Sequence, residues 1–170
     1  MRKPEPLCAA LLAKIEEQIE RTDRLVAALP EDRLDWAPAF PGAWPAGTLL
    51  GHLLECLAGI CAVLWSAAPE RLAHFTELRG LPVNHHCAKA EARERIAIYA
   101  LRIREGFAVI GDHDLGRLLP TVFVSEGERV ATLLLGNLEH LINHKHQLFT
   151  YLKLMGVAVS SRDLYRFRGE

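Results

Sequence analysis

Apolar residues recur at intervals of three and four over four long stretches of the chain, a spacing that places them on one face of an α-helix. These stretches run from Leu7 to Leu29, Thr48 to Ala67, Lys89 to Ile110 and Ala131 to Met155. Strand-like alternation is rare elsewhere. Four amphipathic helices of about 20 residues each predict an all-α four-helix bundle.

Proline and glycine residues mark the ends of these stretches. Pro30 ends the first, Thr48 is the expected N-cap of the second, and Gly156 after the fourth fits a C′ position with positive φ. Residues Leu119–Val130 alternate between apolar and polar on either side of a Ser-Glu-Gly sequence. A small hairpin is therefore predicted before the last helix.

A long loop is expected between the first and second helices, over residues 31–47. It contains three prolines besides Trp36 and Trp44, which leaves room for no more than a short helical turn near Glu31–Leu34. We expect the two tryptophans to seal one end of the core.

The composition is that of a globular protein. A length of 170 residues, with 50% hydrophobic and 24% charged residues, predicts a single domain spanning residues 1–170. The net charge of −1 gives no electrostatic reason to expect a nucleic-acid or anionic-membrane partner. No uninterrupted apolar run approaches the about 18–20 residues that cross a bilayer, so no membrane association is expected. Acidic and basic residues interleave, as in Glu91–Arg95, which is typical of a solvated helix face.

The cysteines indicate a reducing compartment. Cys8, Cys56, Cys61 and Cys87 form neither a CxxC pair nor a dense disulfide framework, so we expect reduced thiols and a cytoplasmic location. The short apolar stretch Leu7–Ala13 runs directly into charged residues of an amphipathic pattern. We interpret it as the start of a helix and not as a targeting segment.

Three histidines fall on the core-facing sides of two different helices. At about 100° per residue, His144 lies about 40° from His140 on the last helix, and both border its apolar arc. His146 falls on the opposite, solvent-facing side. His52 borders the apolar arc of the second helix. Three neutral imidazoles with positions left open are a pattern of catalytic metal sites. Spacing alone leaves open that they are core histidines bonded to backbone or to each other.

Two segments resemble the DinB-like (DinB/YfiT) superfamily. The first comprises Trp36-Ala-Pro and Ala43-Trp44-Pro-Ala-Gly-Thr-Leu-Leu-Gly-His52-Leu, and the second comprises Glu139-His140-Leu-Ile-Asn-His144-Lys145-His146-Gln147 and Tyr151-Leu-Lys-Leu-Met-Gly156. The chain departs from the family at Lys145-His146, where Arg-Gly is usual. The resemblance implies a four-helix bundle, commonly a homodimer, that binds zinc, nickel or another divalent ion. Matched residue by residue, the ligands fall on His52, His140 and His144.

Five further residues are candidates near such a site. Glu55 could orient the His52 imidazole or be an exposed helix glutamate, and Cys56 could approach the metal, be a reactive thiol or be a small buried residue. Asn143 and Gln147 could assist the site. Tyr151 could line the pocket as a hydrogen-bond donor or simply pack. Glu55 and Tyr151 are the weak candidates for catalytic roles; the catalytic residues are otherwise unknown.

Two further histidine-bearing sequences are expected to be structural. Adjacent residues rarely point together, so His85-His86-Cys87 is not expected to form a second metal site. The sequence Asp112-His113-Asp114 is interpreted as a turn after the third helix.

By resemblance, the leading hypothesis for function is a metal-dependent thiol S-transferase in detoxification or stress response. One divalent ion, zinc or nickel, would activate a low-molecular-weight thiol of the bacillithiol, mycothiol or glutathione type for attack on an electrophile. One alternative is hydrolysis of a small substrate by activated water, with Glu55 as base. The other is a non-catalytic, stress-associated bundle stabilised by its ion.

Overall fold

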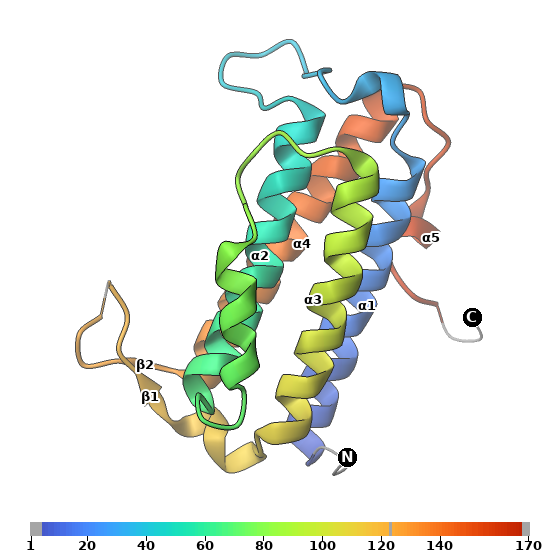
Figure 1. Cartoon of the computed structure of the whole chain (residues 1–170). Helices are drawn as coiled ribbons and strands as arrows, with labels where there is room; N and C mark the ends of the chain where they lie inside the picture. Colours follow the sequence, from blue (N-terminus) through green and yellow to red (C-terminus); the bar gives the residue numbers. More distant parts are fainter. Residues whose placement is uncertain (1–4, 123, 168–170) are drawn as a thin grey trace.

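Four long helices pack side by side in the computed structural model, which describes residues 5–122 and 124–167 (Figure 1). The helices are α1 (Pro6–Ala28), α2 (Ala46–Ala67), α3 (Lys89–Val109) and α4 (Val130–Leu154). Helices α1 and α2 each pack against both α3 and α4. The predicted all-α bundle is confirmed.

Short elements occupy the connections. They are η1 (Glu31–Arg33), η2 (Ala73–Gly80), η3 (Asp112–Gly116), β1 (Leu118–Leu119), β2 (Glu128–Arg129) and α5 (Ser161–Leu164). Strands β1 and β2 pair antiparallel, with Leu118 opposite Arg129. The predicted hairpin is thus present, but its paired strands are shorter than the alternation indicated and its connection is longer than a tight turn. The short helices η2 and α5 were not predicted because neither is long enough to display a helical period.

Helix α2 begins at Ala46, ahead of the expected N-cap Thr48. The reason is a contact with the preceding loop. The backbone N–H of Ala46 donates to the carbonyl of Trp36 at 2.9 Å, and that of Gly47 donates to the carbonyl of Leu34 at 2.8 Å. Since loop carbonyls already satisfy the first amides of the helix, no side-chain cap is needed.

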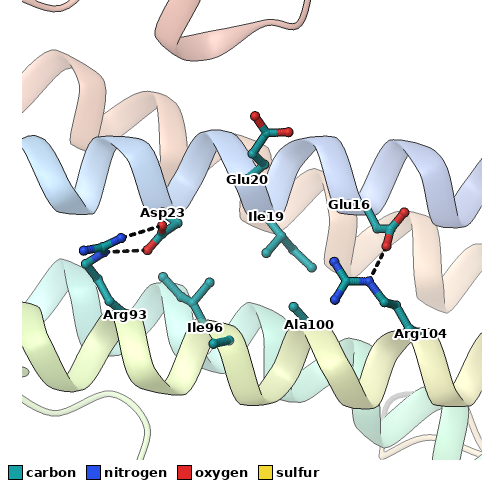
Figure 2. A pocket seen from close by; sticks show the side chains of 9 residues that line it. Glu16, Ile19, Glu20, Asp23, Arg93, Ile96, Ala100 and Arg104 are labelled. Atoms are coloured by element: carbon teal, nitrogen blue, oxygen red, sulfur yellow. Dashed lines mark hydrogen bonds and ion pairs between the residues drawn. The ribbon is translucent and has the colours of Figure 1, made fainter.

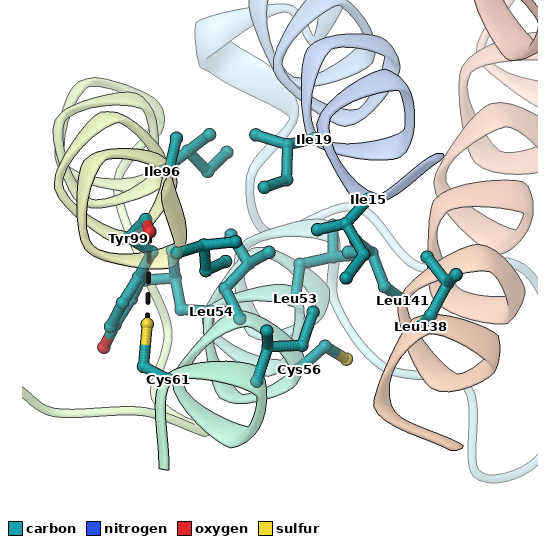
Figure 3. Close-up of a cluster of buried hydrophobic side chains, with 14 of the residues drawn as sticks. Ile15, Ile19, Leu53, Leu54, Cys56, Cys61, Ile96, Tyr99, Leu138 and Leu141 are labelled. Atoms are coloured by element: carbon teal, nitrogen blue, oxygen red, sulfur yellow. Dashed lines mark hydrogen bonds between the residues drawn. The ribbon is translucent and has the colours of Figure 1, made fainter. Parts of the chain in front are cut away.

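All four long helices contribute to one apolar core. In Figure 3, Ile15 of α1, Leu53 and Leu54 of α2, Ile96 of α3 and Leu141 of α4 lie together in the centre of the bundle. Helix α2 is the most apolar of them: an 18-residue window has a mean hydropathy of 1.8, long and apolar enough to cross a membrane. However, 67% of that window is buried inside the fold, as in the core helix of a bundle.

Helices α1 and α3 meet along a groove with charged ends (Figure 2). Arg93 pairs with Asp23 at 2.8 Å, and Arg104 pairs with Glu16 at 2.5 Å. Ile19 and the small side chains of α3 lie between the two pairs. Exposed pairs of this kind contribute little free energy, so the apolar contact between them holds the helices together.

Lys145 is buried inside the bundle. Its Nζ donates to Oε1 of Gln18 on α1 at 2.6 Å and to the carbonyl of Leu164 in α5 at 2.9 Å. Burial lowers the pKa of Lys145 to about 8. This residue therefore ties α4 to α1 and α5.

Candidate metal centre

His52 on α2 meets His140 and His144 on α4 near one end of the bundle. The Nε2 atom of His52 lies 3.0 Å from Nε2 of His140 and 3.1 Å from Nε2 of His144. The ligand atoms of all three lie within 4.8 Å of one another. The helix projection placed these histidines on core-facing edges, and the packing of α2 against α4 brings the edges together.

Hydrogen bonds at the outer nitrogens determine which ring atoms face the centre. Nδ1 of His52 lies 3.0 Å from Oε2 of Glu55 and 2.6 Å from Oδ1 of Asn84. A carboxylate only accepts, so this Nδ1 donates and the neutral ring has a lone pair on Nε2. Nδ1 of His144 likewise lies 2.9 Å from Oε1 of Gln147.

This arrangement fits a divalent cation. Lone pairs on converging Nε2 atoms repel one another unless a positive charge lies between them. Two imidazole ligands of a tetrahedral ion, each about 2.0–2.1 Å from the metal, are about 3.3 Å apart, close to the separations seen here. Three nitrogen donors suit zinc, nickel and similar ions and leave coordination positions open.

The partial burial of the cluster favours the neutral, ligating form of the rings. Burial lowers the pKa of His140, and the neighbouring His52 lowers it further. Burial also lowers the pKa of His144, while its hydrogen bond with Gln147 acts in the opposite direction. The side chain of His52 is 16% exposed, so the cluster is not sealed from solvent.

Trp44 covers the histidines from the long loop between α1 and α2. Its ring lies stacked on His144, with centroids 5.9 Å apart, and edge-on to His52 at 4.8 Å. Trp36 packs edge-on against Tyr151 at 5.4 Å. Both tryptophans thus close the end of the bundle where the histidines lie.

Tyr151 and Gln147 link this loop to His144. The Tyr151 hydroxyl donates to the carbonyl of Trp44 at 3.1 Å, and Nε2 of Gln147 donates to the same hydroxyl at 3.2 Å. Tyr151 is buried, so its hydroxyl is committed to holding the loop. This geometry favours the packing interpretation of Tyr151 and gives Gln147 contact with a histidine of the cluster.

Cys56 and Asn143 are not drawn into the cluster. The thiol of Cys56 donates to the carbonyl of His52 at 3.5 Å, and burial raises its pKa to about 12. Cys56 does not belong to the group of side chains whose ligand atoms converge. Asn143 is exposed on α4.

Sequence reasoning missed Asn84. It lies in the loop before α3, adopts a left-handed φ of 57°, and donates its backbone N–H to the carbonyl of Gly51 at 3.1 Å. Asparagine tolerates this conformation better than most residues, which is the one local signal available. Its partner His52 is remote in sequence, and no periodicity connects the two.

The adjacent side chains of His85 and His86 diverge, as expected, but a different convergence is found. His86 turns away to Asp35, at 3.0 Å, but the ligand atoms of His85 and Cys87 converge with that of Glu91 to within 4.8 Å. Cys87 reaches Glu91 because the side chain of Glu91, in the first turn of α3, points back to the loop. The solvated face expected for Glu91–Arg95 is wrong at Arg95, which is buried.

Asp112 occupies η3, in place of the simple turn that was expected. Its carboxylate accepts from the backbone N–H groups of Leu7 at 3.1 Å and Cys8 at 2.9 Å, which are among the first amides of α1. Asp112 thus caps a helix more than a hundred residues away in sequence.

Comparison with known proteins supports the same architecture. A sequence model described as the DinB superfamily matches residues 14–148. The fold is similar to the crystal structure of a DinB-like protein, YjoA, from Bacillus subtilis, with a TM-score of 0.67 and 17% identity over 88% of this chain and 94% of that one. A comparison with curated proteins gives no significant match. At this identity the structural likeness shows a shared fold.

Proposed function

This chain belongs to the DinB superfamily, and we propose that it binds one divalent metal ion through His52, His140 and His144 and uses it to activate a low-molecular-weight thiol for attack on an electrophile. The observation that carries the proposal is the convergence of three Nε2 atoms, with two of the outer nitrogens held by oxygen acceptors. Such outer contacts fix the tautomer and the orientation of metal-binding histidines.

The ion would supply Lewis acidity, which lowers the pKa of a thiol bound in an open coordination position. The chain itself performs the remaining tasks. His52 and His144 are oriented by Glu55, Asn84 and Gln147, and Trp44 shields one side of the cluster from water. The partly exposed side leaves an approach for the thiol and the electrophile.

The hydrolase alternative loses its main support. Glu55 contacts Nδ1 of His52, and Nδ1 and Nε2 point in different directions from the imidazole ring. Its carboxylate therefore lies behind the ring, away from the point where the three Nε2 atoms meet. Glu55 fits an orienting role better than that of a base for activated water.

Metal content tests the site. We expect wild type to hold about one zinc or nickel ion per chain that His144→Ala lacks, measured by inductively coupled plasma mass spectrometry on protein purified without affinity-tag metal. His146→Ala is the matched control, since His146 is exposed on the same helix. Wild type that takes up no metal after reconstitution would overturn the proposal.

Thiol consumption tests the reaction. Metal-loaded protein should accelerate the loss of free thiol when glutathione, bacillithiol or mycothiol is mixed with a panel of alkyl halides and epoxides. The acceleration should vanish in His144→Ala and persist in His146→Ala. Metal binding without any thiol-dependent turnover would instead identify a non-catalytic bundle stabilised by its ion.

A further inference from the structure

We propose that His85, Cys87 and Glu91 form a second metal site, for zinc or a similar thiophilic divalent ion, where the preceding loop enters α3. Nε2 of His85 lies 2.9 Å from Oε1 of Glu91, and the ligand atoms of the three residues lie within 4.8 Å of one another. The Cys87 thiol lies beside the Glu91 carboxylate and donates to the carbonyl of Ala88 at 3.4 Å. One imidazole, one thiol and one carboxylate thus face a common point.

This donor set is one that zinc takes in proteins. Zinc binds cysteine sulfur, histidine nitrogen and carboxylate oxygen, and a thiolate ligand selects against magnesium and calcium. Three protein ligands leave a fourth position for water. The set differs from the three imidazoles of the first site, so the two sites have separate spectroscopic signatures.

The ion pair with Glu91 uses only the Nε2 atom of His85. Nδ1 of His85 is buried and has no hydrogen-bond partner within the part of the chain that the structure describes. Arg95 does not displace His85 from Glu91: its Nη1 is 3.7 Å from the carboxylate, while its Nη2 donates to the carbonyl of Pro82 and the hydroxyl of Tyr99. The carboxylate therefore remains directed toward His85 and Cys87.

Helix α2 supports the loop that carries two of the ligands. The backbone N–H of Cys87 donates to the carbonyl of Gly47 at 2.9 Å. A Cβ atom on Gly51 would lie only 1.9 Å from the carbonyl oxygen of His85. The loop can approach this closely because Gly51 has no side chain. Helix α2 therefore holds His85 and Cys87 in position before any metal binds.

The second site has a structural consequence for the first. Asn84, which contacts Nδ1 of His52, directly precedes His85 in the same loop. An ion held by His85, Cys87 and Glu91 would hold this loop against α2 and keep Asn84 in place behind His52. The role that follows is structural support of the three-histidine cluster.

Cobalt substitution tests the proposal, because a thiolate bound to Co²⁺ produces a sulfur-to-metal charge-transfer band in the near ultraviolet and imidazole does not. Wild type, kept reduced with a phosphine and titrated with Co²⁺, should show this band. Cys87→Ser should lose the band and one equivalent of Co²⁺. His144→Ala should keep the band, which separates this site from the three-histidine site.

Two further variants guard the interpretation. Cys56→Ser should keep the band, since Cys56 is the cysteine beside His52. Glu91 is partly exposed, so the fold should tolerate Glu91→Gln better than a change at buried Cys87. This variant should weaken Co²⁺ binding at the thiolate site at least about tenfold. No band in wild type, a band that survives Cys87→Ser, a band lost in Cys56→Ser, or unchanged affinity in Glu91→Gln would each overturn the proposal.

Discussion

His52 has two oxygen acceptors at its Nδ1 atom, one from its own helix and one from a distant loop. Glu55 lies one turn along α2, and Asn84 comes from the loop before α3. Both stabilise the tautomer that presents Nε2 to the cluster. Asn84 makes the shorter contact and is held in a left-handed conformation, so it fixes the ring in one orientation.

Substitution of Asn84 should therefore weaken metal binding without unfolding the protein. Asn84→Gly retains access to the left-handed φ and removes the amide, and we expect about a tenfold loss of affinity. Asn84→Asp keeps an acceptor and a residue type that tolerates this φ, so its loss should be smaller. Isothermal titration with zinc or nickel measures both. Wild-type affinity in Asn84→Gly would show that Asn84 does not support the site.

Among the elements, the loop before α3 and helix α2 make the contact that positions both clusters. The backbone of residues 84–87 lies directly on the first turns of α2 through bonds to Gly47 and Gly51. The close approach at Gly51 requires glycine, because a side chain would meet the backbone of His85, which cannot easily move aside, whereas a Cβ atom on Gly47 would meet the His86 ring.

Gly51→Ala should destabilise the protein by about 2 kcal/mol or more, since a methyl group would overlap the carbonyl of His85. Gly136→Ala is the matched control. A Cβ atom there meets nothing within 4 Å, and alanine should stabilise α4 by about 0.5–1 kcal/mol. Urea unfolding followed by circular dichroism measures both. Equal stability of Gly51→Ala and wild type would exclude the close contact.

The capping of α1 by Asp112 predicts a pH-dependent effect. Backbone hydrogen bonds, first from Cys8 and then from Leu7, hold the pKa of Asp112 below its ordinary value of 3.8. The ionised carboxylate is therefore favoured by folding, and its stabilisation is present above pH 3.8 and disappears as the pH falls through the lower folded-state pKa.

Asp112→Ala should lower the melting temperature by a few degrees at pH 7. The difference from wild type should shrink as the pH falls below 3.8, and thermal unfolding between pH 7 and pH 3 measures it. A difference that stays constant over this range would mean that the charge of Asp112 is not involved.

For the whole molecule, the three-histidine site would cross-link α2 to α4. These helices share the most extensive contact in the described part of the bundle, and an ion that binds only the folded state stabilises it by mass action. The homodimer implied by the family resemblance stays a prediction, which the molar mass from light scattering tests.

Metal removal should lower the melting temperature. At a free ion concentration about 100 times the Kd, binding adds about 2.7 kcal/mol, which corresponds to a shift of about 5–10 °C for a chain of this size. A chelator should produce this shift in wild type and His146→Ala, and a smaller one in His144→Ala, where only the proposed site at His85, Cys87 and Glu91 remains. The same shift in His144→Ala would assign the stabilising metal to another site.

Features that depend on local geometry could be read from the sequence. Helical period alone placed His140 and His144 on one face of α4, because angular position along a helix depends only on spacing. The predicted end of α4 is also confirmed, because Gly156 has a φ of 80°, a conformation that favours glycine. The bundle itself follows from four apolar faces that must be buried together.

Tertiary structure alone decided which loop residues accompany the histidines. Asn84 reaches His52, and Glu91 reaches His85 and Cys87, because the loop before α3 packs on α2 at a place where glycine permits close contact. Such a contact joins residues from separate elements, and no periodic pattern in either element records the partner. The helices and their histidine faces are therefore encoded locally, while the surroundings of both clusters arise from the packing of distant backbone segments.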